Sequence, residues 1–156
     1  MRSVEETRPC PGLSVPVVTV LDEAGGVADA DQRSLVRHVI QSGWGADVIF
    51  AAGTTGEWDR VANPVRQQVV QICAEEVAKE NARLGQKPGR PVEAWAGVTA
   101  PTARETLENL EFAIFAGADA AVLAPLSIQG IDDAVRFVLR DVADLLATSS
   151  RRIPVY

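Results

Sequence analysis

Short apolar runs rich in β-branched residues alternate along the chain with longer stretches in which apolar residues recur every three to four positions. The short runs predict buried strands, and the longer stretches predict amphipathic helices. We expect strands at residues 15–20, 47–52, 92–98 and 120–124, and a last one that begins at residue 153. This alternation is typical of βα units and a parallel sheet.

Four helices are expected between these strands, and residues that favour helix ends mark where each begins and stops. The residues expected to open them are Asp29, Asn63 with Pro64 beside it, Thr102, and the pair Asp132 and Asp133. The glycines expected to end the first three are Gly43, Gly85 and Gly117. Two of the openings carry the partner of a capping box three residues on, namely Gln32 and Glu105.

Two of the helices have apolar stripes that make a specific prediction about packing. The stripe of the second helix includes Cys73, so we expect this thiol to lie in the core. In the fourth helix the spacing predicts one apolar face that packs on the sheet. Its residues are Val135, Val138, Val142 and Leu145.

Composition and charge narrow the class of protein. The chain has 156 residues, of which 47% are hydrophobic and 23% charged, which is typical of an ordered globular domain. Its net charge of -6, without a basic cluster, makes nucleic acid an unexpected partner. No apolar run is long enough for a membrane span, and the first ten residues lack the apolar centre of a signal peptide. With only Cys10 and Cys73 as cysteines, we expect a soluble cytoplasmic protein.

The spacing of the strands leaves two architectures open. About 35 residues separate successive strand starts, close to the repeat of a (β/α)8 TIM barrel, of which this chain would supply four units and the start of strand five. An open doubly-wound sheet needs only four or five strands. Because a chain that stopped at an apolar half-made strand would leave an exposed edge, we expect a continuation after Tyr156. We assign residues 1–11 to an N-terminal arm and residues 12–156 to the N-terminal half of a barrel.

The tripeptide Gly-Ala-Asp occurs at residues 45–47 and again at residues 117–119, each time after a helix and before a strand. One explanation is that joints between helices and strands favour this pattern. The other is the duplication of a βαβα unit.

The second predicted strand runs directly into Gly53, Thr54, Thr55 and Gly56. Parallel-sheet proteins place ligands at the carboxyl ends of their strands. Glycines allow a close approach of the backbone, and two hydroxyls with backbone N–H groups suit a small anion such as a carboxylate. The loop lacks the endings of a P-loop and of a dinucleotide fingerprint. From the residues alone, an anion-binding loop and a plain tight turn both remain open.

Several segments together resemble the dihydrodipicolinate synthase and N-acetylneuraminate lyase family. These segments are Val17-Val18-Thr19, Gly53-Thr54-Thr55-Gly56-Glu57, Ala96-Gly97-Val98, Thr102-Ala103-Arg104-Glu105 and Ala116-Gly117-Ala118-Asp119-Ala120. The likeness extends over nearly the whole chain, and the loop after the second strand is its most specific piece. The resemblance implies a TIM barrel of about twice this length.

The same resemblance implies a class I aldolase or lyase that acts on a pyruvate-type 2-keto acid, as a homo-oligomer. A lysine amine forms a Schiff base with the keto carbon, and a phenol moves protons. By this likeness Thr55 binds the keto-acid carboxylate through its hydroxyl and backbone N–H, Thr54 is the catalytic residue of a proton relay, and Gly53 and Gly56 complete the binding loop. No metal or organic cofactor is implied, and one histidine with two distant cysteines gives no metal-ligand pattern.

The chain also departs from the family's pattern. The family's Schiff-base lysine lies on strand six, and we expect neither Lys79 nor Lys87 to replace it. Tyr156, the one tyrosine, falls short of the position of the family's relay tyrosine. Leu126 and Ser127 stand where the synthase has two tyrosines, which favours a member other than dihydrodipicolinate synthase itself. A non-catalytic half-barrel or anion-binding α/β module is the alternative.

Overall fold

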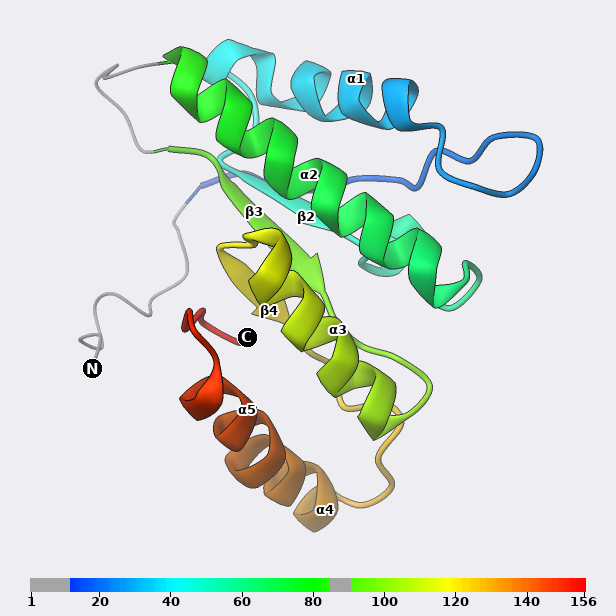
Figure 1. Cartoon of the computed structure of the whole chain (residues 1–156), viewed down its shortest axis with the longest axis vertical. Coiled ribbons are helices and arrows are strands. Elements are labelled where there is room, and N and C mark those ends of the chain that lie inside the picture. The colour runs from blue at the N-terminus through cyan, green and yellow to red at the C-terminus, as the bar shows by residue number, and fades with distance from the viewer. Residues whose placement is uncertain (1–11, 85–90) are drawn as a thin grey trace.

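The computed structural model describes residues 12–84 and 91–156, so the expected arm at residues 1–11, Cys10, Gly85 and Lys87 lie outside the described residues. Within it, four strands form one parallel sheet in the order β1–β2–β3–β4 (Figure 1). The strands are β1 (Ser14–Pro16), β2 (Val48–Ala51), β3 (Glu93–Gly97) and β4 (Ala120–Val122).

Helices connect consecutive strands, and each packs against the next one along the chain (Figure 1). The first three are α1 (Asp29–Ile40), α2 (Asn63–Leu84) and α3 (Ala103–Ala116). The fourth helical region comprises α4 (Ile131–Arg136), a π-helical turn η4 (Phe137–Val142) and α5 (Ala143–Thr148). Two short 3-10 turns, η2 (Gln41–Gly43) and η3 (Thr54–Gly56), follow α1 and β2.

The order of the strands decides between the two predicted architectures. A doubly-wound sheet reverses its strand order at a switch point, whereas a barrel adds each new strand on the same side. Here every strand lies beside the one before it, and the predicted fifth strand continues the series. Ala121 N donates to Pro154 O at 2.9 Å, and Tyr156 N donates to Ala121 O at 2.9 Å. The chain therefore forms consecutive units of a (β/α) barrel.

The first strand is shorter than predicted. The ladder covers Ser14–Pro16 and not residues 15–20, although Val17 N still donates to Phe50 O at 3.0 Å. Beyond Val17 the chain leaves the sheet, because its polar groups find partners elsewhere: Thr19 Oγ1 donates to Gly56 O at 2.9 Å. The apolar pattern of residues 15–20 correctly indicated that Val17 is buried. It did not indicate where the hydrogen-bonded pairing with β2 ends.

The predicted capping box at the start of the first helix is wrong. Ala28 is the N-cap residue, and no side chain caps the helix. Asp29 instead forms an ion pair with Arg33 at 2.8 Å. Gln32 is fully buried, and its Oε1 accepts from Val20 N at 2.8 Å. The glutamine side chain is therefore committed to the loop after β1, so it cannot return to the helix end.

Of the other predicted helix ends, both ends of α3 and the start of α2 are confirmed, whereas the end of the first helix and the start of the fourth are wrong. Thr102 caps α3, because its hydroxyl oxygen accepts from Glu105 N at 3.1 Å. Gly117 ends α3 in the left-handed conformation, with φ 91°. The α2 helix begins at Asn63, as expected.

The α1 helix ends at Ile40 and not at Gly43, because Gln41 takes the left-handed conformation that closes it. The fourth helical region begins at Ile131 after Gly130, so Asp132 and Asp133 lie inside its first turn and do not cap it.

The predicted apolar face of the fourth helix is only half correct. Val142 is buried and Leu145 partly so, but Val135 is 49% exposed and Val138 is 38% exposed. The π-helical turn η4 contains both Val138 and Val142, and its wider turn changes which residues share a face. Phe137, which the stripe did not include, is buried in place of the first two valines.

The repeated Gly-Ala-Asp tripeptide has a local structural reason. Asp47 Oδ2 accepts from Leu13 N at 2.7 Å, at the entrance of β1. Asp119 Oδ2 accepts from Ala94 N at 2.9 Å, in the neighbouring strand β3. Each aspartate therefore fastens the start of its own strand to the backbone of the strand beside it. This shared contact favours a structural joint as the explanation of the repeat.

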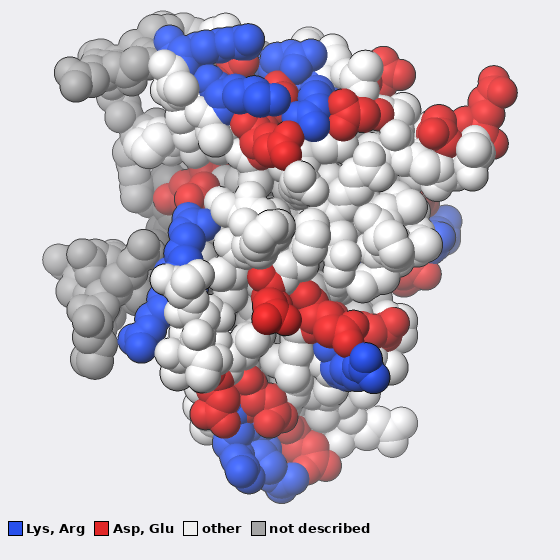
Figure 2. Space-filling model, viewed as in Figure 1, with Lys and Arg blue, Asp and Glu red and all other residues white. Residues whose placement is uncertain are grey.

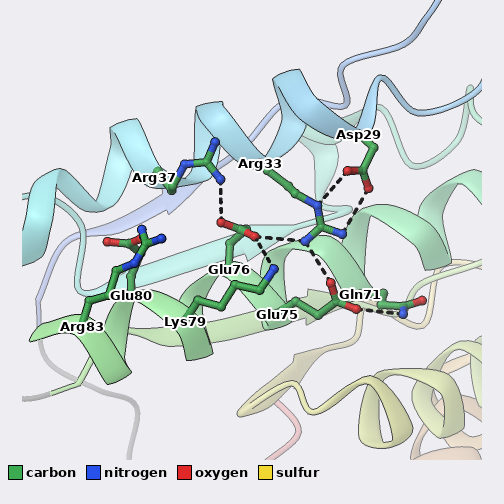
Figure 3. A network of polar contacts seen from close by, with 9 residues as sticks. All are labelled: Asp29, Arg33, Arg37, Gln71, Glu75, Glu76, Lys79, Glu80 and Arg83. Carbon is green, nitrogen blue, oxygen red and sulfur yellow. Dashed lines mark hydrogen bonds and ion pairs between the residues drawn. The ribbon is translucent and has the colours of Figure 1, made fainter. Parts of the chain in front are cut away.

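Ion pairs join α1 to α2 on the side away from the sheet (Figure 3). The side chain of Glu76 on α2 is 3% exposed and forms ion pairs with three basic side chains. These are Arg33 at 3.0 Å, Arg37 at 2.7 Å and Lys79 at 2.8 Å. Burial raises the pKa of Glu76, but the three hydrogen bonds outweigh it and lower that pKa to about 2. Figure 2 shows basic and acidic side chains interleaved over these helices.

Cys73 lies in the core, as predicted, and burial raises the pKa of its thiol to about 12. Of the helices that the structure describes, none combines the length and apolar character required to cross a membrane.

Candidate functional site

The loop after β2 turns sharply through two strained residues. Ala52 has φ 54° and Glu57 has φ 53°, and both lie in the left-handed region that favours glycine. Between them the η3 turn is closed by two hydrogen bonds, from Gly56 N to Gly53 O and from Glu57 N to Thr54 O, each 3.0 Å long. Strain of this kind is concentrated at functional sites in many proteins.

The two glycines of the loop are buried, and both fit against the protein itself. A Cβ on Gly53 would stand 2.6 Å from the ring of Phe50. A Cβ on Gly56 would stand 3.3 Å from Val17 O. The small size of Gly53 therefore lets the loop pack against β2, and Gly56 lies close to the backbone after β1. The approach to a ligand that the sequence suggested stays a prediction.

The two threonines between the glycines are exposed. Within residues 12–84 and 91–156, no side chain or backbone group hydrogen-bonds to the hydroxyl of Thr54 or Thr55. The N–H groups that begin a helical turn have no acceptor inside the turn. The loop thus presents two hydroxyls, supported by backbone donors, at the carboxyl end of β2. The structure brings together all four predicted site residues in this one turn.

Side-chain hydrogen bonds also form at the carboxyl ends of the strands beside this loop. The hydroxyl of Thr19, which follows β1, donates to Gly56 O at 2.9 Å. On the other side, Arg66 Nη2 donates to Thr99 O at 2.5 Å, just after β3. The hydroxyl oxygen of Thr99 in turn accepts from Ala124 N at 2.9 Å, just after β4. Side-chain hydrogen bonds therefore join the end of β1 to the loop and the end of β3 to that of β4, and Arg66 of α2 binds the end of β3.

Sequence reasoning missed Arg66 and Thr99 in this arrangement. Both are buried, and they are 33 positions apart in the chain. The available signal was an arginine between Val65 and Val69, on the inward stripe of the predicted helix. A charged residue at such a position has to find polar partners inside the protein.

Trp58 follows the loop directly and lies over Arg66, with 5.5 Å from the guanidinium carbon to the ring centroid. This contact shows a packed aromatic at the start of α2.

Trp95 lies on the face of β3 opposite to Ala94 and Ala96, which are buried in the core. Its ring is 4.9 Å from that of Tyr156, measured between centroids, and its Nε1 donates to Glu93 Oε2 at 2.8 Å. Tyr156 is thus placed on the beginning of the fifth strand and stacked on Trp95.

Three other residues that bear on the site lie outside residues 53–56. Lys79 binds Glu76 between α1 and α2 and not at a strand end. His38 is exposed on α1. Leu126 is 71% exposed in the segment that follows β4. No group of three or more histidine, cysteine, aspartate or glutamate side chains that could hold a metal ion occurs in the described part of the chain.

A family model described as the dihydrodipicolinate synthetase family matches residues 9–91. A 4-hydroxy-tetrahydrodipicolinate synthase of Methanothermobacter thermautotrophicus is 31% identical over 112 residues, which is 72% of this chain and 35% of the relative. An uncharacterized DapA-like lyase of Halobacterium salinarum is 34% identical over 113 residues, again 72% of this chain and 33% of the relative. The chain thus spans about a third of these relatives' length.

Solved structures show the same fold. One is YagE of E. coli K12, a prophage protein of the dihydrodipicolinic acid synthase family in complex with pyruvate, with a TM-score of 0.67 and 23% identity over 92% of this chain and 43% of that one. Another is the N-acetylneuraminate lyase of Mycoplasma synoviae, with a TM-score of 0.69 and 18% identity over 98% of this chain and 46% of that one.

Proposed function

The chain belongs to the dihydrodipicolinate synthetase family, and on that premise we propose that it forms the carboxylate-binding part of a Schiff-base (class I) aldolase or lyase acting on a pyruvate-type 2-keto acid. The observation that carries this proposal is the pair of exposed hydroxyls of Thr54 and Thr55, held on a strained turn at the carboxyl end of β2. The pyruvate complex of the E. coli relative supports the choice of keto acid.

The geometry of the loop suits this role. Thr55 donates from its hydroxyl and backbone N–H to the carboxylate, and these charge-assisted bonds fix the orientation of the adjacent keto group. Thr54, beside it, takes part in moving a proton. The electron-withdrawing imine is supplied by a lysine of strand six, a part of the family's barrel that this chain does not include.

The proposal favours a substrate pair other than that of dihydrodipicolinate synthase. Leu126 is exposed at the carboxyl end of the sheet, with Ser127 after it, where the synthase carries tyrosines. The apolar side chain of Leu126 suits a less polar acceptor molecule than the phenol of a tyrosine at this position would. We further propose that the protein is a cytoplasmic homo-oligomer, in keeping with the family resemblance.

Pyruvate titration tests the binding step. The 156-residue chain is titrated with pyruvate and the amide signals of Thr54, Thr55 and Gly56 are followed by NMR. We expect these amides to shift with pyruvate and not with acetone, which lacks the carboxylate. Thr55→Val should weaken binding at least about tenfold, because it removes a hydrogen bond to a charged group. Thr148→Val, an exposed substitution at the end of α5, should leave binding unchanged. Pyruvate binding that Thr55→Val does not weaken would contradict the proposal.

One observation favours a second candidate, an anion-binding module without catalysis. Lys79 is held by Glu76, away from the strand ends, and Lys87 lies outside the described residues. Borohydride added to the full-length polypeptide with pyruvate distinguishes the two. A mass increase by one reduced pyruvate indicates the Schiff-base enzyme. Pyruvate binding without any adduct indicates the module.

A further inference from the structure

Arg66 is a buried cation whose hydrogen bonds all go to neutral acceptors. Its residue is 3% exposed, and its guanidinium donates to Thr99 O at 2.5 Å, to Gly97 O at 3.5 Å and to Asn63 Oδ1 at 3.4 Å. Its Nε has no hydrogen-bond partner among the described residues, and no carboxylate there forms an ion pair with it. Burying a guanidinium in this way is costly, so its position calls for an explanation beyond packing.

Two of the three acceptors, Gly97 O and Thr99 O, lie at the carboxyl end of β3, beside the loop. Gly97 is in such close contact with β2 that a Cβ on it would stand 2.3 Å from Ala52 O. Ala52 is the strained residue that leads into Gly53. By holding the Gly97 and Thr99 carbonyls, the guanidinium fixes the surface against which the beginning of the loop is pressed.

The same guanidinium also reaches the far end of the loop. Trp58 follows Glu57, the second strained residue, and its ring lies over Arg66 at 5.5 Å. A cation above an aromatic ring is attracted to its face. One side chain of α2 therefore contacts Trp58, which follows residues 53–57, and the carbonyls of Gly97 and Thr99, beside which Ala52 lies. Within the described part of the chain, it forms no hydrogen bond with Thr54 or Thr55.

We propose that Arg66 is a positioning residue that holds residues 53–57 in their strained, open conformation. It does so by fixing the Gly97–Thr99 carbonyls on one side and Trp58 on the other. The consequence for ligand affinity rests on the proposed function, because it assumes that Thr54 and Thr55 bind a keto-acid carboxylate. The consequence for the order of the loop does not depend on any ligand.

Hydrogen exchange without ligand tests the positioning. The amides of Gly56 and Glu57 close the turn, so their exchange rates report its order. In Arg66→Met we expect these rates to rise about tenfold, because the variant loses hydrogen bonds from a charged donor together with the contact to Trp58. Arg33→Met removes an arginine from the ion pairs between α1 and α2, and it should leave both rates unchanged.

Two further variants keep the test decisive if Arg66→Met does not fold. Trp58→Leu removes only the aromatic contact and should raise the two rates about threefold. Arg66→Lys keeps the charge but lacks the planar fork, so it should restore part of the protection. Unchanged exchange of Gly56 and Glu57 in Trp58→Leu, or an equal rise in Arg33→Met, would overturn the proposal.

Pyruvate affinity completes the experiment and separates the two proposals. Where the unaltered chain binds pyruvate, we expect Arg66→Met to weaken binding about tenfold while Arg33→Met has no effect. If the unaltered chain does not bind pyruvate, the proposed function fails, yet the exchange rates still decide whether Arg66 positions the loop. If Arg66→Met raises exchange and leaves affinity unchanged, the link between loop order and binding is wrong.

Discussion

The sharpest test of the fold's energetics is the substitution Glu76→Gln, which removes one charge and almost no volume. The side chain of Glu76 is buried between α1 and α2, and its oxygens bind Arg33, Arg37 and Lys79 (Figure 3). Glutamine can keep part of the hydrogen bonding, but it leaves three cations around a neutral group. We therefore expect a loss of stability that depends on pH.

The magnitude follows from the pKa of Glu76. The hydrogen bonds lower it from 4.5 to about 2 in the folded chain, and each pKa unit corresponds to about 1.4 kcal/mol. Ionisation of this group therefore contributes about 3 kcal/mol to the free energy of unfolding. Because the folded pKa lies below the unfolded one, the contribution is present above pH 4.5 and is lost as the pH falls toward 2.

The assay is urea unfolding of both proteins across this pH range. At neutral pH, Glu76→Gln should be less stable by about 3 kcal/mol, and the difference should shrink steadily as the pH falls below 4.5. Glu111→Gln, an exposed position on α3 that forms no ion pair with any described residue, serves as the control and should change stability by less than about 0.5 kcal/mol. A difference between wild type and Glu76→Gln that stays constant down to the lowest pH would refute the reasoning.

Two further predictions concern the core and the sheet. Because burial raises the pKa of Cys73 to about 12, iodoacetamide should label this thiol only after denaturation. Peptide mass spectrometry measures the labelling, and rapid labelling of the native protein would contradict the burial of Cys73. Gly97→Ala should lower the free energy of unfolding by at least about 2 kcal/mol, because the new Cβ would stand 2.3 Å from Ala52 O. Urea unfolding measures this loss. Wild-type stability in the variant would show that β2 and β3 can separate at no cost.

Much of the fold could be predicted because each βα unit is marked by local signals. Apolar runs located the strands to within a few residues, and Thr102 and Gly117 located the ends of α3 through contacts that span only one turn. The errors occurred where a longer-range contact overrides a local preference. Gln32 bonds to the chain after β1, so the expected capping box does not form. The π-helical turn likewise separates Val135 and Val138 from the buried face, and nothing in the helical spacing indicates it.

The candidate site could likewise be predicted only where its residues are neighbours in the sequence. Residues 53–56 are contiguous, so the pattern of glycine and threonine identified the whole turn from the sequence. Its supports are not contiguous: Thr19 lies 37 positions before Gly56, and Arg66 lies 33 positions before Thr99. Such contacts depend on which strands are neighbours, and periodicity within one helix or strand carries no information about that. The role of Arg66 therefore became visible only once β2 and β3 were placed side by side.

The two ends of the sheet differ in their hydrogen bonding and in their backbone strain. Where β2 and β4 begin, Asp47 and Asp119 hold neighbouring strands through short side-chain bonds, at 2.7 and 2.9 Å to backbone N–H groups. Where β2 ends, the chain instead contains the strained Ala52 and two threonine hydroxyls without a partner in the described part of the chain. Backbone strain reduces stability, so a fold can retain it at one end only if the other end and the helix layer stabilise it. In parallel barrels this separation leaves the carboxyl ends of the strands free to vary with the ligand.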